Sequence, residues 1–342
     1  MTIESLRFLG FMDFRTTFTT VNKAIKYEGG LISLFRKIFK VLGEEGFSGF
    51  LYRIRFLRFN YVQPYLYREP DLSESTMKRI ESFEYKPKIS VVMPVYNVDR
   101  RWLLAAVDSV LAQWYTNWEL CICDDHSTRN ETLEALKEVV EKDDRIRIVY
   151  SEENGNISAA SNAAFKLVTG DYVALMDNDD ELTIDALYEV VRCLQQKRYD
   201  FIYSDEDKIE FDGKFVEPHI KPDFSAELLL CHNYMSHLGV INRKLIEMVG
   251  GWTIGLEGAQ DYDLYLRVLE QTDLVCHIPR VLYHWRKLPG STAAEFSEKS
   301  YAQEAGRRSV ELAIARRGID ATVENGLTSG TYRVKYATKG DS

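Results

Sequence analysis

No stretch of the 342-residue sequence approaches the roughly 18 consecutive apolar residues that a membrane-spanning helix requires. The amino terminus lacks the basic start and apolar stretch of a secretory signal. Cysteine is scarce, and its five residues are an odd number, which argues against a disulfide framework. These absences predict a protein of the reducing cytoplasm that would meet a membrane only at its surface.

Positive charge is not in excess, because 43 lysines and arginines face 52 aspartates and glutamates and leave a net charge of −9. This balance disfavours nucleic acid as a partner of the whole surface. Neither Gly-x-Gly-x-x-Gly nor Gly-x-x-x-x-Gly-Lys follows the first expected strand, which excludes a dinucleotide-dependent dehydrogenase and a P-loop enzyme. The 45% apolar content is that of a globular protein with a buried core.

The first 69 residues differ from the rest in charge, with a net +5 against −14. Within them, residues 21–60 contain an apolar helical stripe, with Arg36, Lys37 and Lys40 on the opposite side, and a second basic and aromatic stretch. Such a segment is typical of a helix lying on anionic lipid. The alternative, a helical hairpin packed on the main domain, is favoured by the fact that amphipathic helices usually face a core. The sequence leaves both interpretations open.

From residue 88, apolar runs of strand length alternate with segments of helical period. Strands are expected at 89–95, 118–123, 145–150, 171–176 and 200–203, and helices at 101–113, 131–141, 157–168 and 183–195. The alternation predicts an α/β fold with a mostly parallel central sheet flanked by helices. Ligands of such sheets bind beyond the carboxyl ends of the strands.

The domain organisation follows from these shifts in pattern. A helical, basic and aromatic arm is predicted at 1–80, an α/β domain at 86–295, and a C-terminal helix and tail, packed on that domain, at 296–342. Beyond residue 204 the alternation weakens. A strand is expected there at 238–241 and helices at 244–249, 262–272 and 298–317, which would supply the second wall of a cleft.

Polar clusters follow three of the expected strands. The clusters are Pro94-Val-Tyr-Asn97, Asp124-Asp-His-Ser127 and Asp177-Asn-Asp-Asp-Glu181. Because parallel strands end at the same edge of the sheet, these carboxylates are expected to converge. Such convergence is unfavourable without a cation or hydrogen-bond donors. Hard oxygen ligands of this kind suit Mg²⁺ or Mn²⁺ beside a diphosphate.

An isolated Asp-x-Asp triplet is weak evidence, and the sequence contains three, at 177–179, 205–207 and 261–263. Only the first directly follows an apolar strand, so its side chains are expected to project from a rigid strand end. The alternative for Asp179 or Asp180 is capping of the next helix.

The series of motifs resembles the family 2 glycosyltransferases, which have the GT-A fold. The matching segments, within about residues 86–295, are Lys88-Ile-Ser-Val-Val-Met-Pro-Val-Tyr-Asn97, Cys123-Asp-Asp-His-Ser127, Gly170-Asp-Tyr-Val-Ala-Leu-Met-Asp-Asn-Asp-Asp-Glu-Leu182, Tyr203-Ser-Asp-Glu-Asp-Lys208, Glu257-Gly-Ala-Gln-Asp-Tyr-Asp-Leu264 and Ile278-Pro-Arg-Val-Leu-Tyr-His-Trp-Arg286. The later motifs are similar to the bacterial branch that builds O-antigen and other surface polysaccharides, rhamnosyltransferases included. The resemblance implies an enzyme that transfers a sugar from a UDP- or dTDP-linked donor to a saccharide or lipid-linked acceptor.

The resemblance also implies roles for the residues around the donor. Pro94, Tyr96 and Asn97 match the loop that holds the nucleotide, and Asp125 matches the carboxylate that binds the pyrimidine base. Asp177 matches the first aspartate of the Asp-x-Asp motif, near the ribose and metal. Three further matches complete the donor and metal set: Asp179 as a metal ligand, His284 on the metal or diphosphate, and Arg286 on the donor.

Asp261 matches the general base of the family, which the resemblance implies for an inverting displacement. Gln260 precedes it where the commonest pattern has glutamate, so one like-charge contribution that would raise the pKa of the base is missing. Trp252, Tyr262 and Trp285 lie in the half expected to receive the acceptor, where aromatic faces stack on sugar rings. Core packing explains each of them equally well.

Two competing functions are considered. A sugar-nucleotide nucleotidylyltransferase uses a related sheet, but a Gly-rich basic loop is expected after its first strand, and Pro94-Val-Tyr-Asn97 has neither feature. A non-catalytic adaptor at a membrane surface would not need the intact carboxylates Asp125, Asp177, Asp179 and Asp261.

Overall fold

The computed structural model describes residues 65–288 and 300–337. One compact unit comprises Leu66–Ser342. The amphipathic segment at 21–60 lies outside the described residues. The predicted boundaries at residues 80, 86 and 295 stay a prediction.

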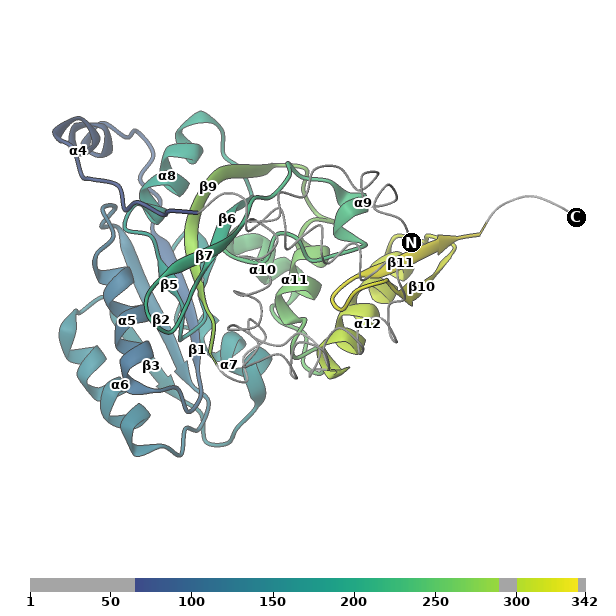
Figure 1. The fold of residues 1–342 in the computed structure, drawn as a ribbon, viewed down its shortest axis with the longest axis horizontal. Coiled ribbons are helices and arrows are strands. Elements are labelled where there is room, and N and C mark those ends of the chain that lie inside the picture. Colours follow the sequence, from purple (N-terminus) through teal and green to yellow (C-terminus); the bar gives the residue numbers. More distant parts are fainter. Residues whose placement is uncertain (1–64, 289–299, 338–342) are drawn as a thin grey trace, which may run out of the picture. The chain divides into compact units, whose positions relative to one another are not determined.

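A single large sheet forms the centre of this unit (Figure 1). The strands are β1 (Ile89–Val95), β2 (Trp118–Asp124), β3 (Ile146–Tyr150), β4 (Tyr172–Leu175), β5 (Glu181–Leu182), β6 (Phe201–Ile209), β7 (Phe215–His219), β8 (Gly239–Asn242) and β9 (Val275–Arg286). Their order is β3-β2-β1-β4-β8-β6-β9-β5, with β7 paired to β6. β1 to β4 are parallel, as are β6 and β9, whereas β8 is antiparallel to β4 and β6. The predicted α/β fold with a central sheet flanked by helices is confirmed, but the sheet is mixed: β1 to β4 form its parallel part, and the antiparallel pairings lie in the half beyond β4.

Helices cover both faces of the sheet (Figure 1). The helices are α4 (Glu74–Glu81), α5 (Arg100–Leu111), α6 (Asn130–Lys142), α7 (Asn156–Phe165), α8 (Ala186–Gln196), α9 (Ala226–Leu229), α10 (Arg243–Val249), α11 (Gln260–Val268) and α12 (Ser300–Arg316). Side chains of β1 alternate between the two faces, because Val91 and Met93 pack with α5, α6 and α8, and Val92 packs with α7, α10 and α11. One apolar core therefore lies on each face of the sheet, and the central strands are buried on both sides.

The half beyond residue 204 contains more strand than the sequence predicts. β6 continues to Ile209 and pairs over its length with β9, a strand absent from the sequence prediction. Charged residues interrupt the apolar pattern of both strands, since buried ion pairs replace apolar contacts there. A separate antiparallel hairpin, β10 (Ala321–Asn325) and β11 (Tyr332–Tyr336), follows α12 and was not predicted either.

Candidate active site

A pocket opens where β1 and β4 end. Its lining brings together residues far apart in the sequence: Val92, Pro94, Ile157, Ser161, Leu175, Met176, Asp177, His237, Trp252, Gln260 and Asp261. Asp177 and Asp261 therefore share one cavity, as the sequence predicted. The pocket lies at the carboxyl edge of the parallel strands, the usual ligand site of an α/β sheet.

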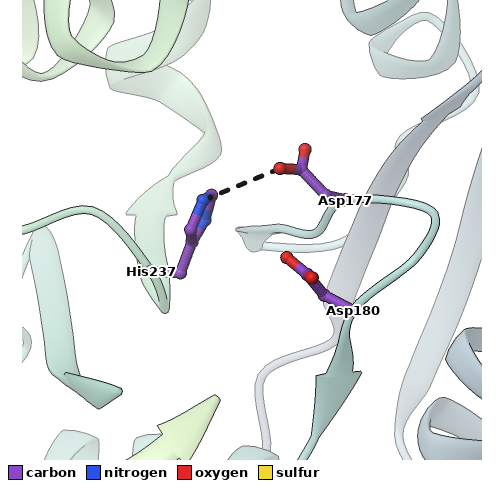
Figure 2. A group of neighbouring side chains, drawn as sticks. All are labelled: Asp177, Asp180 and His237. Atoms are coloured by element: carbon purple, nitrogen blue, oxygen red, sulfur yellow. Dashed lines mark ion pairs between the residues drawn. The ribbon is translucent and has the colours of Figure 1, made fainter. Parts of the chain in front are cut away.

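Two carboxylates and a histidine converge beside this pocket (Figure 2). Asp177, Asp180 and His237 each present a ligand atom, and the three atoms lie within 4.8 Å of one another. The Nε2 atom of His237 is 3.7 Å from a carboxylate oxygen of Asp177. Two oxygens and one imidazole nitrogen form a donor set that suits Mn²⁺ and also accepts Mg²⁺.

The loop that follows β4 is held by groups from β9. The hydroxyl of Tyr283 donates to Asp180 Oδ2 at 2.6 Å and accepts the Asp177 amide at 3.1 Å. The backbone amide of Arg286 donates to Asp180 Oδ1 at 2.7 Å, and its guanidinium binds the Asp179 carbonyl and the Glu181 carboxylate. The loop geometry is thus fixed before any ligand enters.

Negative charge on this loop is incompletely compensated. Burial, together with Asp177, raises the pKa of Asp179 to about 6. Burial and the two neighbouring aspartates raise the pKa of Asp180 well above its usual range. No lysine or arginine is found among the described residues that line the pocket. The residues present therefore fit a divalent cation, because one would relieve the repulsion between these carboxylates.

Asp261 lies in the first turn of α11. Burial raises the pKa of Asp261 to about 6, with a further increase from Asp177 and opposing contributions from His237 and from a hydrogen bond with Gln260. The nearby Asp263 is different, since it accepts hydrogen bonds from Thr253 at 2.6 Å and Arg267 at 2.8 Å. Only the first aspartate of this Asp-x-Asp triplet is available for chemistry.

The loops after β1 and β2 are tied to each other. Asn97 adopts a positive φ of 47°, and its side-chain oxygen accepts the amides of Thr128 and Arg129 at 2.8 and 2.9 Å. Its contacts position the β2 loop. Tyr96 is 49% exposed at the same edge. Pro94 lines the pocket, and its carbonyl accepts a hydrogen bond from Asn178 at 2.7 Å.

Asp125 is buried directly after β2. Its Oδ1 atom accepts the amide of Gly155 at 2.9 Å, which joins it to the amino end of α7. The backbone carbonyl of Asp125 accepts a hydrogen bond from the side chain of Asn154 at 3.1 Å. Asp125 thus stands at the strand edge predicted to hold a nucleotide base.

His284 and Arg286 do not face the cluster of Figure 2. His284 pairs through Nδ1 with Asp207 at 2.5 Å and packs against Tyr67 and Phe215. Side chains alternate along β9, so Tyr283 points to the aspartate loop and His284 to the opposite side. The guanidinium of Arg286 lies over the Trp102 ring, 4.2 Å from its centroid, and is engaged by the aspartate loop. The histidine that lies with Asp177 and Asp180 is His237, whereas His284 is paired with Asp207.

The three aromatic residues predicted on the acceptor side have different surroundings. Trp252 lines the pocket. Trp285 is partly exposed, and its ring centroid is 5.9 Å from that of His237. Tyr262 is 2% exposed, donates its hydroxyl to the Leu229 carbonyl and stacks on Tyr332. Core packing accounts for Tyr262, so it is not proposed below as an acceptor contact.

Sequence reasoning missed the place of His237 beside Asp177 and Asp180, and the contacts that Tyr283 makes with the aspartate loop. His237 sits in an irregular loop before β8, where no periodic pattern indicates which way a side chain points. Tyr283 belongs to the Tyr-His-Trp-Arg segment, and recognising that segment as a strand would have placed Tyr283 and His284 on opposite faces.

Comparisons with known proteins agree with this geometry. Residues 90–250 match the family model described as "Glycosyl transferase family 2". The uncharacterized protein y4gI of Sinorhizobium fredii is 45% identical over 258 residues, which are 74% of this chain and 28% of that protein. The O-antigen biosynthesis protein RfbC of Myxococcus xanthus is 33% identical over 274 residues, 80% of this chain and 21% of that protein.

Solved structures share the fold. The crystal structure of Staphylococcus aureus TarS in complex with UDP-GlcNAc superposes with a TM-score of 0.55 at 17% identity and covers 66% of each chain. This likeness confirms the predicted GT-A fold. The present chain spans only about a fifth to a quarter of the two curated relatives, so their activities do not transfer directly to it.

Proposed function

The chain belongs, through residues 90–250, to glycosyl transferase family 2, and we propose from this premise that it transfers a sugar from a nucleotide diphosphate sugar to a hydroxyl group of a saccharide or lipid-linked acceptor. The observation that carries the proposal is the meeting of Asp177, His237 and Asp261 in one pocket. The relationship to an O-antigen biosynthesis protein supports a role in bacterial surface polysaccharide synthesis. The proposed donor is a UDP- or dTDP-linked hexose or deoxyhexose.

In this proposal Asp177, Asp180 and His237, the cluster of Figure 2, hold a Mg²⁺ or Mn²⁺ ion, and Asp179, the ligand that the family resemblance implies, lies in the same loop. When bound, the ion supplies the positive charge that the pocket lining lacks, beside the departing diphosphate. Both oxygens of Asp180 also accept hydrogen bonds from β9, which fixes this carboxylate beside Asp177 and His237. Arg286 assists indirectly, since it binds the Asp179 carbonyl.

The donor lies, in this proposal, along the carboxyl edge of β1, β2 and β4. Asp125 accepts a hydrogen bond from the nucleotide base, and Pro94 and Tyr96 form the rest of the wall. Asn97 acts on the donor through the loop that it positions. A base-binding role for Asp125 is supported by its burial and by the fixed position that Gly155 gives it.

Asp261 is the proposed general base. Its carboxylate accepts the proton of the acceptor hydroxyl as the oxygen attacks the anomeric carbon, while the bond from that carbon to the diphosphate breaks. Direct displacement inverts the anomeric centre and needs one catalytic carboxylate, because the diphosphate leaves without protonation. A pKa near 6 suits this role, since the group is ionised at neutral pH and retains basicity. Trp252 and Trp285 are the proposed acceptor-side contacts.

A thermal-shift screen of UDP- and dTDP-sugars with Mg²⁺ or Mn²⁺ tests this function. The cognate donor is expected to raise the melting temperature only with the metal, because binding to the folded state stabilises it by mass action. Metal-dependent hydrolysis of that donor should then be lost in Asp261→Asn. A nucleotidylyltransferase would instead form a nucleotide sugar from a sugar phosphate, and an adaptor would show neither shift nor turnover.

We also propose that residues 21–60 bring the enzyme to an anionic membrane where a lipid-linked acceptor is presented. The support is the basic and apolar pattern of the sequence alone. None of the helices within residues 65–288 and 300–337 combines the length and apolar content that a membrane crossing requires. The triple variant Arg36→Glu, Lys37→Glu, Lys40→Glu should reduce sedimentation with phosphatidylglycerol vesicles. Equal sedimentation of both proteins would contradict the membrane role.

A further inference from the structure

A fully buried lysine binds the backbone of the loop that carries His237. Lys221, between β7 and α9, has a side chain with 0% exposure. Its Nζ atom donates to the Met235 carbonyl at 2.6 Å and to the His237 carbonyl, and it pairs with Glu206 at 3.2 Å. The three protons of the ammonium group therefore have three acceptors.

Glu206 completes the attachment from the other side of the same residue. Its Oε2 atom accepts the His237 amide at 2.9 Å, and its Oε1 atom lies 3.2 Å from His219 Nδ1. Glu206 thus binds the amide of His237, and its ion-pair partner Lys221 binds the carbonyl of the same residue. This arrangement leaves little freedom for the backbone from which the imidazole projects.

The ring of His237 is fixed by a second contact. It stacks on Tyr283 with centroids 4.6 Å apart and an interplanar angle of 15°. Tyr283 in turn binds the aspartate loop through its hydroxyl. The His237 Nδ1 atom is buried and has no hydrogen-bond partner among the described residues, so no side-chain hydrogen bond orients this imidazole. Its orientation must come from the backbone clamp and from stacking.

A buried ion pair is a poor source of stability, because desolvation of the two charges offsets their attraction. The complete burial of Lys221 next to the candidate active site is therefore not explained by stability alone. We propose that Lys221 is a positioning residue that, with Glu206, holds His237 Nε2 within reach of the metal ion. This inference rests on the proposed function, because it takes His237 to be a metal ligand.

The test uses the full chain and Mn²⁺ alone, without nucleotide. Electron spin-echo envelope modulation of bound Mn²⁺ detects a coordinated histidine nitrogen, and calorimetric titration gives the affinity. The wild type is expected to show the nitrogen signal and His237→Gln to lose it. Lys221→Met should also lose it and bind Mn²⁺ at least tenfold more weakly, although it retains every carboxylate.

Lys221→Met leaves Glu206 as a buried charge without its lysine, which by itself destabilises the fold. The double variant Lys221→Met, Glu206→Gln removes both charges and keeps an acceptor for the His237 amide. Circular dichroism shows which of these two variants is folded. We expect each folded variant to lose the nitrogen signal. The matched control is Lys88→Met, which removes a lysine from buried Glu119 at the amino end of β1. It should leave the signal and affinity unchanged.

The outcomes separate the two levels of the argument. A nitrogen signal that persists in the folded Lys221 variants, with unchanged Mn²⁺ affinity, overturns the positioning role and leaves the proposed function intact. Wild-type protein that binds Mn²⁺ without a nitrogen signal overturns His237 as a ligand, and the inference with it. Wild-type protein that binds no Mn²⁺ contradicts the metal part of the proposed function as well.

Discussion

Two acidic segments of this protein look alike in sequence and behave differently in structure. In β6, Asp205, Glu206 and Asp207 are buried and each has a basic partner, His277, Lys221 and His284 respectively. In the loop after β4, the described structure places His237 3.7 Å from Asp177 and hydrogen-bond donors of β9 on Asp180, and no lysine or arginine pairs with the carboxylates of Asp177, Asp179 and Asp180 within these described residues. The acidic residues of β6 therefore form a network of ion pairs, whereas the loop after β4 retains negative charge without a matching cation.

The pKa values express this difference. Burial alone would raise the pKa of Glu206, but Lys221 and His219 outweigh it and hold the value well below its usual range. The pKa of Asp179 is instead raised to about 6 and that of Asp180 well above normal. A carboxylate cluster without its own cations is the one that favours binding of an external cation.

The largest effect is expected from Asp261 and Asp263, the two aspartates of α11. They show the same difference between a carboxylate paired with a basic side chain, Asp263, and one that lacks such a pair, Asp261. Asp261→Asn should lower kcat by about 10²- to 10⁴-fold, the usual contribution of a general base. Its melting temperature should not fall, because the ionised form of Asp261 is disfavoured by burial. Asp263→Asn should instead lower the free energy of unfolding by about 3 kcal/mol, since Arg267 loses a buried partner. Comparable kcat losses in both variants at equal stability would refute the assignment.

The second largest effect is expected at the two histidines that face these segments. His237→Gln should weaken Mn²⁺ binding at least about tenfold, measured by titration calorimetry. His284→Gln should leave Mn²⁺ affinity unchanged and lower the melting temperature, because the buried pair of His284 with Asp207 is lost. The reverse pattern would restore His284 as the metal ligand that family resemblance implies.

The strands β1 to β4 and part of the site could be predicted from the sequence, because they depend on periodicity. Asp177 directly follows a continuous apolar strand, which fixes the edge on which it lies. His237 could not be assigned, because its orientation comes from long-range contacts with Lys221, Glu206 and Tyr283. His284 could be matched to a motif, but its direction depends on the pleat of a strand that the charged pattern of β9 conceals.

A third expectation concerns stability in acid. A lowered folded-state pKa means that Glu206 stabilises the fold above its unfolded value, near 4.3, and loses this contribution as pH falls toward the folded value. Glu206→Gln should therefore be less stable than wild type at pH 7, by about 3 kcal/mol. The difference in urea unfolding should shrink between about pH 4 and pH 2. A difference independent of pH would mean that packing, not charge, dominates at this position.

The smallest effect is a shift in the pH profile of catalysis. The base must be ionised to accept a proton, so kcat/KM for the cognate donor should fall tenfold per pH unit below the pKa of Asp261, about 6. Gln260 now lowers that pKa by a hydrogen bond to the carboxylate. Gln260→Glu replaces the donor with a like charge, which disfavours ionisation of Asp261, and the acidic limb should move to higher pH by up to about one unit. Gln260→Met is the neutral control: it loses the hydrogen bond without adding charge, so its limb should lie between the other two. If the acidic limb of the kcat/KM profile does not move in Gln260→Glu, a group other than Asp261 governs the pH dependence. The difference between compensated and uncompensated carboxylates would then not extend to the general base.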